Sequence, residues 1–390
     1  MKPADVAIIG GGVIGSAIAY NLLAIDPLVA VVVVERDPTY RTASSALSLS
    51  SIRQQFSAPV NIAMSRYGLA FLKAIDRHLS VDGTSPAVGL VERGYLYLAS
   101  EAGKVALAAN HAIQREHGVD VALLDRNALK RRFPWLKTSD LAAGSFGLSG
   151  EGWFDGWTLL QAFRGKARSL GARFVTGEVV GLDLAGTRVE ALRLADGTRI
   201  ACANAVNAAG PWAGGVAAMA GIDLPVHPEK HCVFVFDCKD PPPECPLVID
   251  ASGIYFRPEG RFFLCGGAPE EKASGAIPPL EVDYALFDDV IWPRLGERVP
   301  AFAAIKLQNA WAGYYEMNVF DQNAILGTAP EVPNFYFANG FSGHGMQQSP
   351  AAGRGIAELI LHGAYRTLDL SPLGFERVRR NEPFYERNVI

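Results

Sequence analysis

The sequence is short of cysteine, of net charge and of long apolar runs, and each shortage excludes a class of protein. Its five cysteines form no CxxC pair and have no histidine at metal-ligand spacing, so we expect neither a disulfide framework nor a metal site. Charged residues are 19% of the chain and the formal net charge is −4. That balance gives no electrostatic reason to expect a nucleic acid or an anionic membrane as partner.

Membrane and secretion signals are also missing from the pattern. The run LVAVVVV, residues 28–34, has the length of a strand and is too short to span a bilayer. The N-terminus carries one lysine and then enters a strand-and-glycine pattern, which is unlike a signal peptide. The sequence contains no internal repeat and no low-complexity tract, so a solenoid is not expected. We therefore expect a cytoplasmic protein without a membrane span.

What is present is a globular composition, with 49% hydrophobic residues in 390, in a chain longer than one core usually supports. Strand–glycine–helix patterns stand near both ends and in the middle, with antiparallel material inserted between them. This arrangement predicts an α/β fold with two domains. A discontinuous Rossmann-type domain would hold residues 1–80, 145–220 and 310–390, and an α+β domain rich in antiparallel strands would hold residues 81–144 and 221–309.

Three local patterns predict particular elements. GYLYLAS, residues 94–100, alternates as a half-buried antiparallel strand does. Asp196-Gly197 predicts a hairpin turn. Ser349 followed by Pro350 predicts the N-cap and first turn of a helix that ends near Gly363.

A glycine motif near the N-terminus predicts dinucleotide binding. Gly10, Gly12 and Gly15 form GxGxxG between a strand and a helix. They permit a tight turn, a close approach of a pyrophosphate, and close helix–strand packing. Glu35 ends the next strand about twenty residues later, where a carboxylate can accept both ribose hydroxyls. An acid there favours NAD or FAD over NADP, with a solvated strand end as the alternative.

Separated motifs carry a family resemblance over essentially the full length. They are GGGVIG (10–15), ASSALSLSSIRQQFS (43–57), NAAGPWA (207–213) and GFSGHG (340–345). In these motifs the sequence resembles the glycine oxidase, sarcosine oxidase and D-amino-acid oxidase family of FAD-dependent amine oxidoreductases. WAGYYE (311–316) and FDQNAILG (320–327) are closer to a subgroup with a mitochondrial FAD-dependent oxidoreductase linked to respiratory complex I assembly.

The resemblance implies FAD, held without a covalent link because residues 312–318, AGYYEMN, lack the cysteine that attaches flavin in some relatives. The helix after GFSGHG would aim its N-terminal dipole at the reducible end of the flavin. The resemblance implies cofactor contacts at Gly10, Gly12, Val13, Ile14, Gly15, Glu35, Arg36, Ser44, Ser45, Ser50, Ile52, Val179, Ala208, Gly210, Trp212, Gly313, Gly340, Ser342, Gly343, His344, Gly345, Met346 and Gln347.

The same resemblance implies a substrate site. Arg53 matches the position where sarcosine oxidases clamp the substrate carboxylate, and a guanidinium can make two parallel charged hydrogen bonds. Tyr255 matches an active-site tyrosine, and Arg257 would share its strand face as a second carboxylate ligand. Together with Arg53 and Tyr255, His344 and Gln347 would complete the catalytic set. The alternatives are an exposed arginine, a core tyrosine and a turn histidine.

Two positions depart from the sarcosine oxidase pattern. Gln347 stands where those enzymes carry a carboxylate-binding lysine, and Leu264 stands where they carry a lysine that assists the reaction with oxygen. The resemblance implies oxidation of a small secondary or tertiary amine acid such as sarcosine, dimethylglycine or iminodiacetate, with O2 expected as acceptor. A dehydrogenase with another acceptor, and an assembly protein with structural flavin, stay open.

Overall fold

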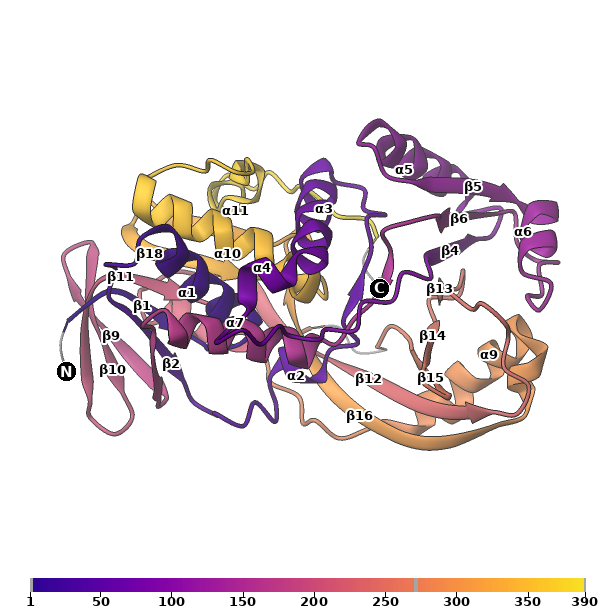
Figure 1. Ribbon diagram of the computed structural model, residues 1–390, viewed down its shortest axis with the longest axis horizontal. Helices are drawn as coiled ribbons and strands as arrows, with labels where there is room; N and C mark the ends of the chain where they lie inside the picture. Colours follow the sequence, from indigo (N-terminus) through magenta and orange to yellow (C-terminus); the bar gives the residue numbers. More distant parts are fainter. Residues whose placement is uncertain (1–2, 270–272, 389–390) are drawn as a thin grey trace.

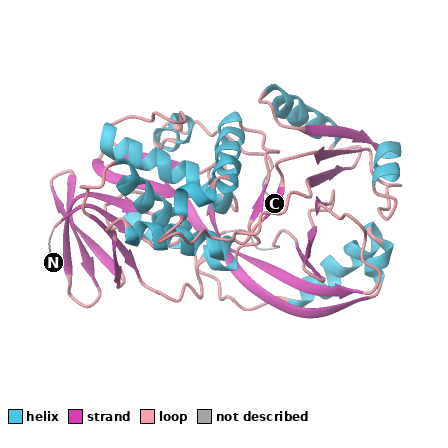
Figure 2. Ribbon diagram, viewed as in Figure 1, coloured by secondary structure: helices cyan, strands magenta, loops and turns pink. Residues whose placement is uncertain are grey.

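The computed structural model describes residues 3–269 and 273–388 and shows two halves side by side along the longest axis (Figure 1). Helices crowd the half that contains the N-terminus, and strands dominate the other half (Figure 2). Within the described residues, no helix combines the length and apolarity that crossing a membrane requires.

The first half is built on a sheet in the order β17-β18-β11-β1-β2-β8, to which β9 and β10 are joined beside β11. The strands are β1 (Ala4–Ile9), β2 (Val31–Glu35), β8 (Arg173–Thr176), β9 (Val179–Ala185), β10 (Arg188–Leu194), β11 (Arg199–Asn207), β17 (Ile325–Ala329) and β18 (Val332–Asn339). β1 pairs in parallel with β2 and β11. Both faces of these strands are covered, which explains the unbroken apolar run in β2.

Helices cover this sheet, and small residues let them pack closely. They are α1 (Val13–Ile25), α2 (Ser44–Leu47), α3 (Pro59–Lys73), α4 (Ile75–Leu79), α7 (Gly156–Ser169), η1 (Gly210–Trp212), α8 (Ala213–Ala218), α10 (Gly345–His362), η4 (Ser371–Leu373) and α11 (Glu376–Arg379). α1 packs against both α7 and α10. A Cβ at Gly353 would lie 2.7 Å from the carbonyl carbon of Ala17. A glycine in α10 is therefore required for this contact with α1.

The second half is a sheet in the order β16-β12-β15-β14-β13-β4-β6-β5. Its strands are β4 (Tyr95–Ala99), β5 (Val121–Asp125), β6 (Ala143–Gly147), β12 (Val226–Cys238), β13 (Leu247–Ile249), β14 (Tyr255–Glu259), β15 (Phe262–Gly266) and β16 (Ile305–Asn318), and a separate pair is β3 (Ser51–Ile52) with β7 (Gly152–Trp153). Its helices are α5 (Lys104–Glu116), α6 (Arg126–Arg132), η2 (Leu286–Ile291), α9 (Trp292–Arg298) and η3 (Pro300–Ala303). The pairs are antiparallel except β13 with β4.

The predicted α/β fold, a Rossmann-type half and a β-rich half, is confirmed. The boundaries predicted at residues 145 and 310 fall inside β6 and β16. β12 and β16 are the long strands that reach from the junction along the lower edge of the second half (Figure 1). All five cysteines are buried with free thiols.

Two local predictions were wrong. β4 is buried on both faces rather than half-buried, because Tyr95 and Tyr97 pack in an aromatic cluster while the alternate residues face the core. α10 begins at Gly345, four residues before Ser349. Ser349 Oγ donates to the Met346 carbonyl at 2.9 Å, the carbonyl that Pro350 cannot serve because it lacks an N–H.

Two other local predictions are confirmed. The helix α10 stops before Gly363, whose φ of 70° lies in the left-handed region. The antiparallel pair β10–β11 turns at Gly197, whose φ is 85°.

Candidate functional site

A cavity of about 890 Å³ lies at the junction of the two halves. Its wall takes residues from the ends of β1 and β2, from the loop at residues 42–53, from β12, β14 and β16, and from residues 338–347. The carboxyl ends of parallel strands are where open α/β sheets bind ligands. The cavity therefore joins the predicted nucleotide end to the second sheet.

The glycine turn after β1 forms one end of the cavity. Gly10 has a φ of 100°, and a Cβ there would lie 2.3 Å from the Ala208 carbonyl oxygen. A Cβ at Gly15 would lie 2.0 Å from the Gly10 carbonyl oxygen, so this glycine is required for α1 to pack on β1. The N-cap of α1, Gly12, supplies no side-chain cap. The N-terminus of α1, where only the Val13 N–H is taken by a side chain among the described residues, suits an anionic diphosphate.

Hydroxyl groups from the following loop face the same turn. Ser45 Oγ accepts the Val13 N–H at 3.0 Å. Ser44 Oγ lines the cavity and is buried without a hydrogen-bond partner in the described structure. An unpartnered buried hydroxyl calls for a ligand acceptor or donor, and this set of donors fits a phosphate.

The end of β2 holds an acid and an arginine in fixed positions. Glu35 accepts the Gly11 N–H at 2.8 Å with Oε2 and the Asp37 N–H at 2.9 Å with Oε1. The Arg36 guanidinium lies 3.6 Å over the ring of Trp212, a cation–π contact. These side chains close the nucleotide end of the cavity, where Val179, Ala208 and Gly210 also line the wall.

The loop before α10 faces the middle of the cavity. Gly343 has a φ of 90°, and a Cβ there would lie 2.5 Å from the Tyr315 ring. Ser342 also has a positive φ, 49°. The N-cap of α10, His344, makes no side-chain cap, so the first N–H groups of that helix are open to a ligand. Gly345, Met346 and Gln347 line the wall as well.

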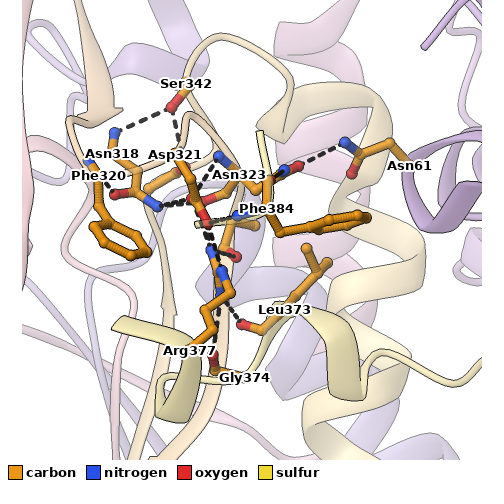
Figure 3. A network of polar contacts seen from close by, with 12 residues as sticks. Asn61, Asn318, Phe320, Asp321, Asn323, Ser342, Leu373, Gly374, Arg377 and Phe384 are labelled. Carbon is orange, nitrogen blue, oxygen red and sulfur yellow. Dashed lines mark hydrogen bonds and ion pairs between the residues drawn. The ribbon is translucent and has the colours of Figure 1, made fainter. Parts of the chain in front are cut away.

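A network of buried polar contacts fixes the loop before α10 through Ser342 (Figure 3). Ser342 Oγ accepts the Asn318 N–H at 3.0 Å, and Asn318 Nδ2 donates to Asp321 Oδ1 at 2.8 Å. Arg377 donates from Nε to Asp321 Oδ2 at 2.6 Å and from Nη2 to Asp321 Oδ1 at 3.0 Å. This two-point ion pair fixes the turn at residues 318–323, and with it the loop at the cavity.

Arg53 reaches the inner end of the cavity and is 1% exposed. Its Nη1 donates to the Gln55 carbonyl at 2.6 Å, and its Nη2 donates to His344 Nε2 at 2.8 Å and to the Asn388 carbonyl. The face of the guanidinium lies 4.0 Å over the Phe56 ring. No carboxylate among the described residues forms an ion pair with this buried cation. The buried Glu151 carboxylate, which is bonded to Gln54 and Gln55, interacts with the Arg53 charge without direct contact.

His344 and Gln347 are held beside Arg53. Because a guanidinium can only donate, His344 Nε2 is an acceptor and the imidazole is neutral. Burial, and then the Arg53 charge, hold the pKa of His344 well below its usual range. Gln347 Oε1 accepts a hydrogen bond from the main-chain N–H of Arg53 at 2.9 Å and from the Ser65 hydroxyl at 3.1 Å. Its Nε2 has no partner among the described residues, so the amide can donate to a ligand.

Aromatic side chains that the sequence reasoning missed surround Tyr255. Tyr95 and Tyr315 line the cavity with it, and burial raises the pKa of all three phenols. The His231 ring stacks on Tyr315 with centroids 3.8 Å apart. His231 Nε2 lies 3.1 Å from Glu229 Oε1. Residues two apart on a strand share a face. The spacing of Glu229 and His231 in the sequence could therefore have predicted that these two side chains lie together.

Four residues predicted to touch ligands do not line the cavity. Arg257 pairs with Glu259 and donates to the Leu49 carbonyl at 2.9 Å, so both of its Nη groups are used, while its Nε is buried without a partner among the described residues. Ile52 is fully buried in the helix-side core. Gly15 serves helix packing as described above, and Gly340 turns the chain at a φ of 72°. The ligand contacts predicted at these four positions stay predictions, because the structure places the residues off the cavity wall.

Glu316 is a cavity-wall acid that the sequence reasoning also missed. Burial raises the pKa of its carboxyl to about 8, partly offset by the N–H groups of Gly340 and Phe341. Since the folded pKa is above the ordinary value of 4.5, its contribution to stability is complete below that value and is lost as pH rises through about 8. No charged side chain contributes to the shift.

We predict that affinity for an anionic dinucleotide weakens as Glu316 ionises. Between pH 6 and pH 9 the dissociation constant should rise about threefold to tenfold, the size of one screened like-charge interaction. In the Glu316→Gln protein the profile should be flat over that range. Quenching of cofactor fluorescence by the apoprotein measures this. Glu331→Gln, at an exposed position, is the control, and a profile unchanged by Glu316→Gln would contradict the assignment.

Comparison with known proteins places the chain among flavoproteins. Residues 5–359 match the family described as FAD dependent oxidoreductase. "FAD-dependent oxidoreductase domain-containing protein 1" of Xenopus laevis is 44% identical over 423 residues, covering 99% of this chain and 85% of that protein. Human mitochondrial sarcosine dehydrogenase is 26% identical, covering 92% of this chain and 40% of that protein. The structure of L-proline dehydrogenase from P. horikoshii is similar with a TM-score of 0.86 and 27% identity, covering 98% and 99% of the two chains.

Proposed function

Because the chain belongs to the FAD dependent oxidoreductase family, as its motifs predicted, we propose that it binds FAD without a covalent link and oxidises a small amine acid. The substrate class is a secondary or tertiary amine that carries a carboxylate, such as sarcosine, dimethylglycine, iminodiacetate or proline. The names of two similar proteins, sarcosine dehydrogenase and L-proline dehydrogenase, support this class.

One observation carries the proposal: a single cavity is lined both by the glycine turn at Gly10 and by Arg53, a guanidinium that forms no ion pair among the described residues. Gly10, Gly12 and the N-terminus of α1 would hold the diphosphate, and Glu35 would accept the ribose hydroxyls. The loop before α10 would face the flavin ring. The space beside Arg53 and Tyr255 is then left for a second, smaller molecule.

The residues of the inner end suit an amine acid. FAD supplies the hydride acceptor when it is bound. Arg53 would attract the carboxylate and orient the carbon next to the nitrogen, and the rings of Tyr95, Tyr255 and Tyr315 would exclude water from it. If His231 donates from Nε2 to Glu229, its Nδ1 would be able to accept a proton from the substrate ammonium. The N–H groups at the start of α10 would stabilise the negative charge that develops on the reduced ring.

Anaerobic mixing of the FAD-loaded protein with each candidate amine acid tests the proposal. Bleaching of the flavin absorption bands by at least one of them is the expected result, since hydride transfer needs no oxygen. A flavin that no amine acid reduces would favour the alternative of a structural cofactor in an assembly protein. Protein that binds no FAD would overturn both readings.

The acceptor that reoxidises the flavin needs its own assay. We propose O2, and peroxide formed during turnover would support it. Turnover only with an artificial dye would indicate a dehydrogenase instead. Leu264, which stands in the place of the relatives' oxygen-assisting lysine, is buried on β15 and does not line the cavity, so Leu264→Lys is not expected to change the acceptor.

A further inference from the structure

Residues 384–388 cross the junction between the two halves and end beside Arg53. This last described segment lies in the middle of the molecule, between the helices of the first half and the strands of the second (Figure 1). The Glu386 carboxylate is fully buried. It accepts the Ser57 N–H at 2.8 Å, the Ala58 N–H at 3.1 Å and Asn61 Nδ2 at 2.9 Å. Glu386 therefore caps α3, whose own N-cap residue Ala58 supplies no side-chain cap.

Asn388 is tied to both halves by its side chain. Its Nδ2 donates to the Gln55 carbonyl at 2.9 Å, and its Oδ1 accepts Asn110 Nδ2, from α5, at 3.0 Å. These two bonds orient the residue so that its main-chain carbonyl accepts from Arg53 Nη2. A neutral carbonyl satisfies a donor of the guanidinium without cancelling its charge.

The position of this carbonyl restricts what Arg53 can offer. A carboxylate held at two points needs either the end face of a guanidinium, Nη1 with Nη2, or the side face, Nε with Nη2. Both hydrogens of Nη2 are already donated, one to His344 Nε2 and one to the Asn388 carbonyl. Only Nε and one hydrogen of Nη1 have no partner among the described residues, and these two do not form a two-point face.

We propose that Asn388 is a specificity-determining residue, whose main-chain carbonyl limits Arg53 to a one-point hold on a substrate carboxylate. The inference rests on the proposed function, since it concerns the carboxylate that Arg53 is proposed to bind. The Asn388 carbonyl makes the affinity of Arg53 for carboxylates weaker than that of a free guanidinium. Because Asn110 on α5 holds the Asn388 side chain, the position of α5 also affects this affinity. A carboxylate that displaces the carbonyl would gain the second bond.

Deleting residues 387–390 tests the inference while Glu386 and its cap on α3 stay in place. The probe is acetate, titrated into the FAD-loaded protein and followed by the flavin difference spectrum. We expect the dissociation constant for acetate to fall about tenfold, the gain from one added charged hydrogen bond. Asn388→Ala removes both side-chain anchors and keeps the chain length, so it should act in the same direction with a smaller effect. Tyr385→Ala, at an exposed position of the same segment, should change nothing.

Arg53→Met in the full and shortened proteins shows whether the gain passes through the guanidinium. The inference holds if shortening tightens acetate only when Arg53 is present. It is overturned if acetate binding is unchanged or weaker after shortening, or if the gain survives Arg53→Met. Melting temperature and FAD content identify a deletion that misfolds, in which case the Asn388→Ala result decides. A protein that shows the gain but whose flavin no amine acid reduces would sink the proposed function and leave the assignment of Asn388 intact.

Discussion

Replacing Asp321 by alanine is expected to lower the free energy of unfolding by about 3–5 kcal/mol, the usual loss when one partner of a buried ion pair is removed. Asp321 is fully buried and receives both Nε and Nη2 of Arg377. It also accepts the backbone N–H of Asn323 at 3.2 Å and of Phe384 at 3.1 Å. The variant would leave the Arg377 guanidinium without a counter-ion. It would also remove the Asp321 acceptor of three donors, the backbone N–H groups of Asn323 and Phe384 and Asn318 Nδ2. Denaturant unfolding followed by circular dichroism measures the loss.

The same change should also weaken FAD binding, because the network in Figure 3 ends on Ser342 in the loop that faces the cavity. Glu376→Ala is the matched control: this residue lies on α11 with Arg377, but its ion pairs with Arg379 and Arg380 are exposed. Removing an exposed pair should change stability little. Equal losses in the two variants would show that the buried pair has no special role.

Replacing Arg53 by methionine should raise the KM for an amine acid by about one to three orders of magnitude, or roughly 1.4–4 kcal/mol of lost charged pairing. The effect should fall mainly on KM, because the guanidinium binds a carboxylate that does not react. Steady-state kinetics with the reduced flavin reoxidised by O2 or a dye give both constants. FAD content should be retained, since the predicted diphosphate contacts lie at the other end of the cavity.

Two comparisons sharpen the Arg53 experiment. Arg53→Lys keeps the charge but loses the planar donor array, so it should recover part of the affinity. An amine without a carboxylate should be oxidised equally by the original protein and by Arg53→Met. An unchanged KM for amine acids in Arg53→Met would remove this residue from the substrate site.

The nucleotide end of the site could be predicted from the sequence because its chemistry is local. Gly10, Gly12 and Gly15 lie within six residues. Their spacing alone predicts the turn, the start of the helix and the close helix–strand packing that the structure shows. The inner end could not be derived in this way. His231, Tyr315 and Glu316 meet there because β12 pairs with β16 in a particular register, and pairing register is a long-range property that no short window of sequence carries.

The sequence by itself determined the fold class, the glycine turn, and, through its motifs, the flavoprotein family, because each follows from patterns contained in short segments. The tertiary structure alone decided the state of the charged groups. Arg257 forms an ion pair with Glu259, whereas Arg53 forms no ion pair among the described residues and donates to His344 and to the Asn388 carbonyl. Residues 53 and 388 are far apart in the chain, and only packing brings them together. The strength of a charge depends on the partners and water that surround it, and the fold sets both.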